Sequence, residues 1–427
     1  MKKTGLLVAN GIMFAAMLAS CGGTSGTGNA IDAKVDALPE NAYVYRGQQS
    51  KTEVMYYSSI MYTLRDQARE YIGKEKFGIV PGDSDDVILK KLHDAKAKWG
   101  IMSETSSAGN VYPTYYLYQH GYTLGFKTRQ EYNALSAEDQ AKAMIGVEQG
   151  TYPKGVDDLM TGTIDVSCGF MDTRYGSAYV QSGGKYEKKE ELFANTYTVA
   201  VTDPIMNDTV SVRASLSEKK REAIAKAFKA AVKDGSVDEK DSTAWLIYQI
   251  YSHTGYVDAK DSDYNSAKDM YKWSEAQKGN TVTVPADVKM DAKDTDDSNK
   301  EINIQLVPSN DPSALQSKAV ALAPKLTALI DNEFTFNITV ATASSGYELT
   351  TQALVSKQID AAFLPAASYA SAYVSKPGKV DVLLSASRAG YKVQADDFPG
   401  FTEADKILQR KAMNGEVDAK GNDITKA

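Results

Sequence analysis

The sequence predicts an α/β protein built from two lobes. Its 427 residues, of which 43% are hydrophobic, are long and apolar enough for two cores of ordinary domain size. Beyond residue 300, apolar extended runs alternate with helical runs, which is typical of a mostly parallel sheet with helices on both faces. The third observation is a hydroxyl-rich turn at 103–113, between a short apolar run and a helical run. Such turns at helix starts are suited to oxyanions.

Local patterns predict the elements of the first half. We expect a strand at 54–64, an acidic loop and short helix at 78–94, a strand from Trp99, helices and loops to Gln149, a helix, glycine turn and buried strand at 152–172, and two extended runs within 196–212. Ser217 then caps an amphipathic helix whose apolar face includes Ile224 and Phe228.

A polar segment at 277–300 separates the two halves and predicts an exposed linker. After it we expect strands at 302–308, 334–341 and 359–364 and helices at 312–330 and 347–357. Ligands bind at the carboxyl ends of strands in such sheets. The loops at 342–347 and 365–369 are therefore candidate binding loops.

The N-terminus has the pattern of a lipoprotein signal peptide. Lys2 and Lys3 precede an apolar run from Leu6 to Leu18, and a cleavage box follows at 18–21. A transmembrane helix is the alternative, but the run is short and a flexible glycine-rich segment follows it. We therefore expect residues 1–20 to be removed and Cys21 to carry lipid, which would anchor the chain to the outer face of the cell membrane.

Charge and cysteine content narrow the possible partners. The formal net charge is −7, which makes nucleic acid an improbable partner. The chain has two cysteines, so a lipidated Cys21 leaves Cys168 without a partner for an intramolecular disulfide. Because Cys168 lies in the apolar run 164–170, we expect a buried and inert thiol.

Ser106 and Ser107 are the first candidates for ligand contact. Free backbone N–H groups at a helix start, the helix dipole and nearby hydroxyls together suit a phosphate-like anion. An ordinary turn with an N-cap is the alternative interpretation of the same residues.

Catalytic equipment is not evident in the sequence. The three histidines, His93, His120 and His253, lie in polar, helix-like contexts without a second histidine at metal-ligand spacing. No Ser-His-Asp elbow, Cys-x-x-Cys pair or Walker loop is present. We expect a binding protein that is not an enzyme and that uses neither a cofactor nor a metal.

Two groups of residues resemble the phosphate/phosphonate-binding protein of ABC transporters. The run 304–307, the helix from Pro312 and the segment 347–369 resemble the start of that family. The turn 106–113, the run 162–165 and the segment 203–213 resemble its later part. The resemblance covers most of residues 51–390 and implies the two-lobed, type II periplasmic-binding-protein fold.

The two parts stand in the reverse of the family's order, which implies a circular permutation. The C-terminal residues 421–427 also resemble residues 28–34, as if each end kept a copy of one former junction. Folds tolerate such a cut because chain ends commonly lie close together at the surface. An artefact of gene assembly is the competing explanation.

The permutation makes each lobe nearly contiguous. The implied organisation is a signal peptide at 1–20, a linker and connector at 21–50, the lobe with the serine turn at 51–203, a second lobe at 204–394 with its internal linker at 277–300, and a C-terminal surface connector at 395–427.

The resemblance assigns further site residues. Ser106 and Ser107 match hydroxyls that cradle the phosphonyl oxygens, and Ala108 stands where a third hydroxyl is common. Tyr152 stands near the place of a phosphonate-binding histidine, and Tyr347 matches a ligand tyrosine. The remaining matches are a second ligand tyrosine, Tyr369, and two carboxylates that hold amine-bearing phosphonates, Asp172 and Asp208. Asp203 is an alternative partner for the amine, and capping of a turn is the alternative role of Asp172 and Asp208. If both carboxylates face the ligand, a zwitterion such as an aminoalkylphosphonate fits better than phosphate.

The implied function is that of a lipid-anchored solute receptor. Its lobes would close on a small phosphorus oxyanion and present it to the permease of an ABC importer. Two alternatives stay open at this point. The site could take inorganic phosphate or a phosphorylated vitamin, or the chain could be a surface sensor or adhesin that has kept the fold without the transport role.

Overall fold

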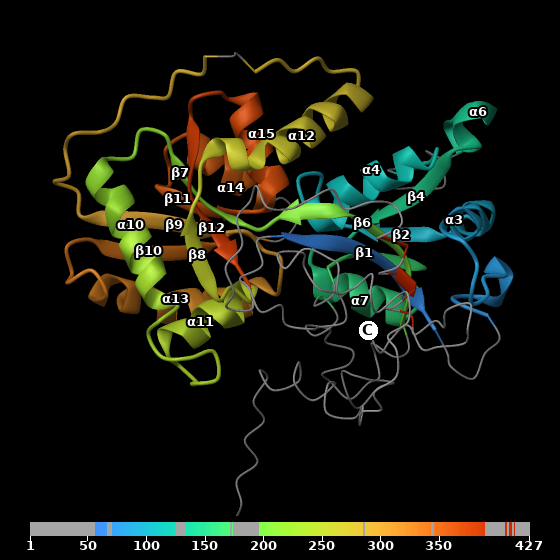
Figure 1. Ribbon diagram of the computed structural model, residues 1–427, viewed down its shortest axis with the longest axis horizontal. Coiled ribbons are helices and arrows are strands. Elements are labelled where there is room, and N and C mark those ends of the chain that lie inside the picture. The colour runs from blue at the N-terminus through green and yellow to red at the C-terminus, as the bar shows by residue number, and fades with distance from the viewer. Residues whose placement is uncertain are drawn as a thin grey trace, which may run out of the picture.

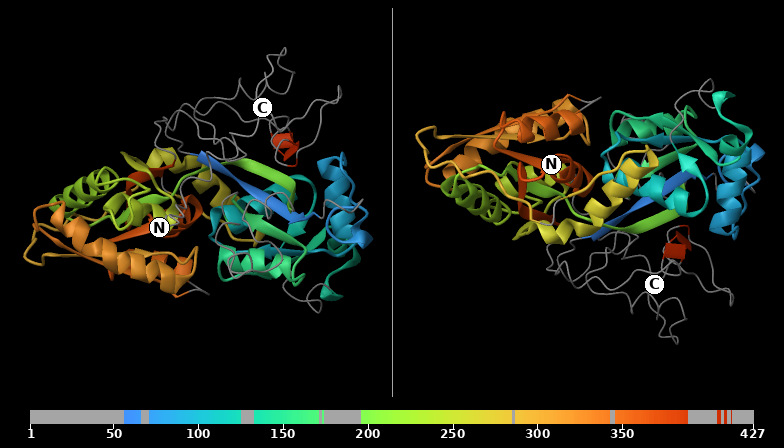
Figure 2. Two further views of the ribbon diagram at one scale, coloured as in Figure 1. Left: turned by 90° about the horizontal axis from the view of Figure 1, so that it is seen from below. Right: turned by 90° about the horizontal axis from the view of Figure 1, so that it is seen from above.

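The computed structural model describes residues 56–65, 71–124, 133–170, 173, 196–284, 287–342 and 346–388, together with 406, 407, 410, 411 and 414. Within this part of the chain, two six-stranded sheets with flanking helices lie side by side as two lobes (Figures 1 and 2). The predicted two-lobed α/β fold is confirmed. Each sheet is mixed rather than mostly parallel, because both sheets contain antiparallel strand pairs beside the parallel ones.

The first lobe holds the sheet β3-β4-β2-β5-β1-β6. Its strands are β1 (Tyr56–Leu64), β2 (Lys98–Ile101), β3 (Thr123–Leu124), β4 (Ala143–Glu148), β5 (Val166–Gly169) and β6 (Thr196–Met206). Its helices are α3 (Asp85–Asp94), α4 (Tyr112–Gln119), α6 (Ala137–Gln140) and α7 (Tyr152–Met160), with the short turns η1 (Glu75–Phe77) and η2 (Ser107–Val111). Strands β2, β3, β4 and β5 form the parallel part of this sheet.

The second lobe holds the sheet β10-β9-β11-β7-β12-β8. Its strands are β7 (Thr209–Arg213), β8 (Gly255–Asp258), β9 (Glu301–Leu306), β10 (Thr335–Val340), β11 (Ala361–Leu364) and β12 (Val380–Ser387). Its helices are α10 (Glu218–Ala231), α11 (Thr243–Tyr251), α12 (Asn265–Gln277), α13 (Pro312–Ala328), α14 (Gly346–Val355) and α15 (Ala366–Ser375), with the 3₁₀ turn η4 (Asp261–Tyr264).

Apolar periodicity explains how the helices dock on the sheets. In α10 the Ser217 hydroxyl caps the first turn by accepting from the Lys220 amide at 3.3 Å, as the sequence predicted. The apolar face of α10 buries Ile224 and Phe228 in the core of the second lobe, where the ring of Phe228 lies 5.1 Å from that of Phe363 in β11. In the first lobe, Trp99 of β2 is fully buried in a separate core.

Two segments from distant parts of the chain meet at the boundary between the lobes. One is the connection from β6 to β7, at Asn207 and Asp208. The other is the end of β12, where the guanidinium carbon of Arg388 lies 5.3 Å from the centre of the Tyr57 ring in β1. A chain in the family's order would run directly from β12 into β1, so this proximity supports the permutation, which stays a prediction.

The predicted linker runs along the surface of the second lobe (Figure 1). Its described residues between α12 and β9 form neither helix nor strand and are mostly exposed. Backbone hydrogen bonds fasten it at two points, from the Asp291 amide to the Gly378 carbonyl at 2.9 Å and from the Asp294 amide to the Ser215 carbonyl at 2.8 Å. The linker is therefore exposed but docked.

Part of the C-terminal connector is built into the first lobe instead of lying on its surface. Arg410 is 0% exposed, and its Nε donates to Asp85 Oδ1 at 2.6 Å. The Asn414 side chain exchanges two hydrogen bonds of 2.7 Å with the backbone of Thr198 in β6. The signal peptide, Cys21 and the connector at 21–50 lie outside the described residues. None of the helices in the described residues is both long and apolar enough to cross a bilayer.

Candidate functional site

The hydroxyl-rich turn lies between β2 and α4, where the sequence predicted it. Ser106 and Ser107 are buried at the start of η2, which continues into α4. Gly109 is required here, because a Cβ at this position would lie 2.3 Å from Cγ of Met102. The first amides of η2 have no carbonyl partners within the helix and so form a set of donors.

Tyr152 meets this turn from a second element. It begins α7, whose first turn is capped by the Thr151 hydroxyl, and its own hydroxyl lies 2.9 Å from Ser106 Oγ. Burial raises the pKa of Tyr152 far above its ordinary value, and the hydrogen bonds of Ser106 and the Gly109 amide only partly oppose this. Tyr152 is therefore a neutral donor at physiological pH.

The turn also contacts the second lobe. Ser107 Oγ accepts a hydrogen bond of 2.9 Å from the Ala367 amide, at the start of α15. Ser368 Oγ donates to the Thr105 carbonyl at 2.9 Å, so the loop at 365–369 faces the serine turn. The Ala108 carbonyl accepts from Ser59 Oγ of β1 at 2.5 Å. Two loops predicted separately thus meet at one place.

The two predicted tyrosines differ in what their hydroxyls do. Tyr347 is buried at the start of α14, and its pKa is raised by burial first and then by Tyr152, Tyr251 and Asp208. It packs in the same buried cluster as Tyr152. The Tyr369 hydroxyl instead donates to Asp261 Oδ1 at 2.8 Å.

The carboxylates are distributed differently from the sequence expectation. Asp208 is held by two groups, with His253 Nε2 at 3.2 Å and Arg388 Nη2 at 3.1 Å from its Oδ2. Asp203 forms an ion pair with Lys406 at 3.0 Å. Asp172 lies outside the described residues.

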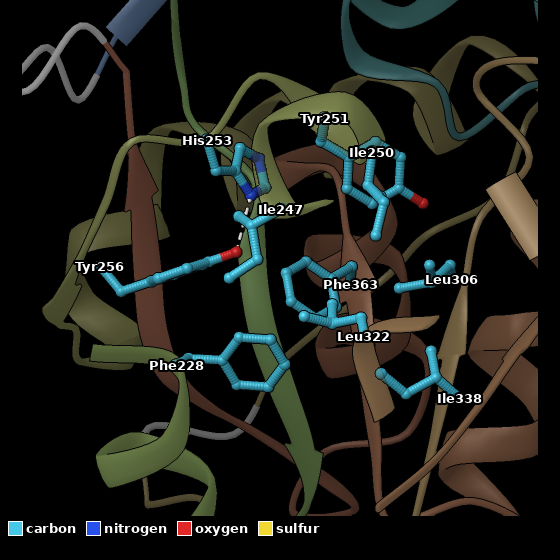
Figure 3. A pocket seen from close by; sticks show the side chains of 10 residues that line it. All are labelled: Phe228, Ile247, Ile250, Tyr251, His253, Tyr256, Leu306, Leu322, Ile338 and Phe363. Atoms are coloured by element: carbon cyan, nitrogen blue, oxygen red, sulfur yellow. Dashed lines mark hydrogen bonds between the residues drawn. The ribbon is translucent and has the colours of Figure 1, made fainter. Parts of the chain in front are cut away.

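Sequence reasoning missed His253 and Arg388. His253 was expected in a polar, helix-like context, but it is 1% exposed, and it lies after the end of α11, which Ser252 terminates with a φ of 57°. Its Nδ1 lies 3.1 Å from the Tyr256 hydroxyl (Figure 3). Arg388 follows the buried strand β12 directly, and a charge in that position is the sequence signal that could have identified it.

The cavity in Figure 3 lies inside the second lobe and is not the anion site. Its walls are mostly apolar side chains such as Phe228, Leu322 and Phe363, and Tyr251, His253 and Tyr256 also line it. Such walls give an oxyanion few hydrogen-bond donors, and burying its charge without partners is costly.

Neither a metal-binding cluster nor a reactive thiol is found among the described residues. No group of three or more His, Cys, Asp or Glu side chains among them is arranged to hold a metal ion. Cys168 is a buried free thiol, as predicted, and burial raises its pKa far above the ordinary value. A thiol of this kind stays protonated and unreactive.

Comparison with solved structures gives weak matches. XAC2383 from Xanthomonas citri bound to ATP is 12% identical, with a TM-score of 0.23 over 36% of this chain and 44% of that chain. The same protein bound to chloride ion is 12% identical, with a TM-score of 0.24 over 36% of this chain and 46% of that one. The chain thus spans less than half the length of these structures.

No curated protein matches the sequence. Residues 57–264, from β1 to η4, match the family model described as "ABC transporter, phosphonate, periplasmic substrate-binding protein". This region contains Ser106, Ser107, Tyr152 and Asp208, and the match confirms the family resemblance found in the sequence. Over this region, which is slightly less than half of the chain, the sequence matches the phosphonate-binding family of periplasmic substrate-binding proteins of ABC transporters.

Proposed function

We propose that this protein binds a phosphonate or a related small phosphorus oxyanion where its two lobes meet, and delivers it to the permease of an ABC importer. The observation that carries the proposal is the meeting of Ser106 with Tyr152 in the first lobe and of Ser107 with Ala367 across the lobes. The family match adds the class of ligand.

The chemistry of the site is that of neutral hydrogen-bond donors around an anion. Ser106 and Tyr152 supply hydroxyl donors, and the starts of η2 and α15 supply backbone amides and the positive ends of helix dipoles. Ser107 Oγ and the Ala367 amide now bond to each other, and an inserted anion would accept from both. Ala108 lacks a hydroxyl, which costs about 1 kcal/mol relative to a third hydroxyl donor.

Ligand binding would stabilise a closed arrangement of the lobes. Thr105 Oγ1 donates to Glu348 at 3.0 Å, and the Tyr152 amide donates to the Ser309 carbonyl at 3.2 Å, both across the boundary. These contacts surround the serine turn, so a ligand at the turn gains partners from both lobes only when they close.

The cellular setting follows from the family and the N-terminal sequence. A periplasmic family implies an extracytoplasmic protein. The lipid on Cys21 would tether it to the membrane beside its permease. The role is binding without catalysis, and the neutral donors around the turn suit it without a cofactor.

Calorimetric titration of the full chain in detergent tests this proposal. Methylphosphonate and inorganic phosphate are the probes, and sulfate is the control anion. We expect one-to-one binding of at least one phosphorus oxyanion, and a loss of about tenfold in affinity for Ser106→Ala, equivalent to about 1.4 kcal/mol. Ser317→Ala, an exposed helix hydroxyl, is the matched control. Absence of binding by both probes, or an unchanged affinity in Ser106→Ala, would refute the assignment.

A further inference from the structure

Arg388 places a positive charge at the boundary between the lobes. Its Nη2 lies 3.1 Å from Asp208 Oδ2, its Nη1 donates to Oδ1 of Asn207, and its guanidinium lies against the Tyr57 ring. The side chain is 15% exposed. One cation therefore contacts the β6–β7 connection and the first strand of the other lobe.

Asp208 has both its charge and its hydrogen bonding satisfied within the protein. Burial raises its pKa, but the hydrogen bond of His253 and the charge of Arg388 lower it by more, so Asp208 is ionised at neutral pH. Burial lowers the pKa of His253, so the ring is neutral. Because a carboxylate only accepts, the proton of His253 lies on Nε2 and is donated to Asp208. The net charge of the three side chains is zero.

This neutral cluster borders the candidate anion site. The Tyr57 ring, against which Arg388 lies, is 6.1 Å from the ring of Phe170, and the Phe170 ring is 5.1 Å from that of Tyr152. An unpaired carboxylate there would repel a phosphorus oxyanion, whereas the Arg388 pair removes most of that repulsion.

We infer that Arg388, by pairing with Asp208, makes the site select phosphorus oxyanions without an ammonium group over aminoalkylphosphonates. This rests on the proposed function. An ammonium group bound at Asp208 would have to displace the Arg388 guanidinium and leave that cation buried without its counter-ion, which is costly. The sequence favoured a zwitterion only if both Asp172 and Asp208 faced the ligand, and the contact with Arg388 gives Asp208 a different role.

Comparing two ligands on the unmodified protein is the first test. The full chain in detergent is titrated with methylphosphonate and with 2-aminoethylphosphonate at equal ionic strength and neutral pH. We expect methylphosphonate to bind at least about tenfold more tightly, equivalent to about 1.4 kcal/mol. This measurement needs no substitution and so does not depend on a variant that folds.

Arg388→Gln is the second test, because it removes the charge and keeps a polar side chain. Freed from its partner, Asp208 would repel methylphosphonate and accept the ammonium group, so we expect the preference to invert. Adding Asp208→Asn should bring the methylphosphonate affinity back to within about threefold of the unmodified protein, a difference below about 1 kcal/mol. Arg213→Gln is the matched control, since Arg213 is 12% exposed and ion-paired with Asp360 at the other end of β7.

The outcomes separate the two proposals. Binding of 2-aminoethylphosphonate at least as tight as that of methylphosphonate, or a preference unchanged in Arg388→Gln, overturns the role of Arg388 and leaves the proposed function standing. Failure of methylphosphonate, 2-aminoethylphosphonate and phosphate to bind overturns both.

Discussion

The ring of Trp273 in α12 lies 4.8 Å from the ring of Tyr115 in α4, in edge contact across the boundary between the lobes. The ring of Tyr118, on the same helix as Tyr115, lies 5.1 Å from that of Trp273. Aromatic pairs of this kind contribute about 0.5–1.5 kcal/mol beyond their buried area. They therefore favour the closed arrangement and tie Trp273 to it.

Trp273 should report lobe closure by its fluorescence. If the lobes open without ligand, the indole meets water, and ligand binding returns it to the aromatic contact. We expect saturating methylphosphonate to shift the emission maximum to shorter wavelength, and Trp273→Phe to abolish the shift. Trp245→Phe, in α11 of the second lobe, is the control and should keep it. A shift that survives in Trp273→Phe would show that this residue does not sense closure.

Tyr347 and Tyr369 should differ in their importance for binding. A tyrosine hydroxyl has one proton, and that of Tyr369 is donated to Asp261. We expect Tyr347→Phe to reduce the affinity for methylphosphonate about tenfold and Tyr369→Phe less than about threefold, a difference of under 1 kcal/mol. Titration calorimetry measures both. Equal losses would show that Tyr369 contributes as much to the ligand as Tyr347.

His253 should make stability depend on pH. Its pKa in the folded protein is below the value of about 6.5 in an unfolded chain, mainly because of burial. The unfolded chain therefore binds more protons in that window, and the free energy of unfolding falls as the pH drops below about 6.5, by at most about 1.4 kcal/mol per pH unit. The lowered pKa of Asp208 acts at more acidic pH, since its stabilisation is lost only as the pH falls through its folded value.

Denaturant unfolding between pH 7 and pH 5 measures this effect. We expect His253→Asn to flatten the pH dependence, because the substituted side chain does not titrate. The same measurement on His120→Asn, which removes the imidazole that pairs with the exposed Asp86, checks that the change is specific to the buried ring of His253. A slope that is the same in His253→Asn as in the unmodified protein would contradict the assignment.

The permutation predicts that the family's order can be restored. The contact of Arg388 with Tyr57 brings the end of β12 to the start of β1. The family match covers 57–264 and ends before the linker, as expected if a linear comparison aligns one side of a permuted chain. Both observations support a circular permutation of this chain.

A variant that begins near Lys300, joins residue 427 to residue 30 and ends near Asn280 tests it. We expect this variant to fold and to bind methylphosphonate within about threefold of the unmodified protein, because the contacts around the serine turn are unchanged. Circular dichroism and calorimetry are the measurements. A variant that is unfolded, or folded without binding, would count against the permutation.

Local signals explain how much of the fold was predictable. Alternating patterns and caps lie close together in sequence, so β9, α13, β10, α14 and β11 were all found within a few residues of their bounds. The order of the strands was harder. Strands β7 and β12 pair antiparallel through tertiary register, and nothing in either segment alone specifies that pairing.

The candidate site was likewise predictable where it depends on local motifs and not where it depends on long-range contacts. The turn at Ser106 and the helix start at Tyr152 are local motifs. The family resemblance assigned both to one site, and the structure places their hydroxyls within hydrogen-bond distance. The pairing of Asp208 with Arg388 joins residues that are far apart in the chain, and only the fold brings them together. The charge seen by a ligand depends on that pairing, so the sequence alone could not specify it.

The buried contact between Arg410 and Asp85 bears on how the protein matures during export. A chain that leaves the cell from its N-terminus presents Asp85 long before Arg410 emerges, and until then this carboxylate lacks its counter-ion. The first lobe therefore completes its packing only after the residues of the second lobe, which precede Arg410 in the chain, have been synthesised.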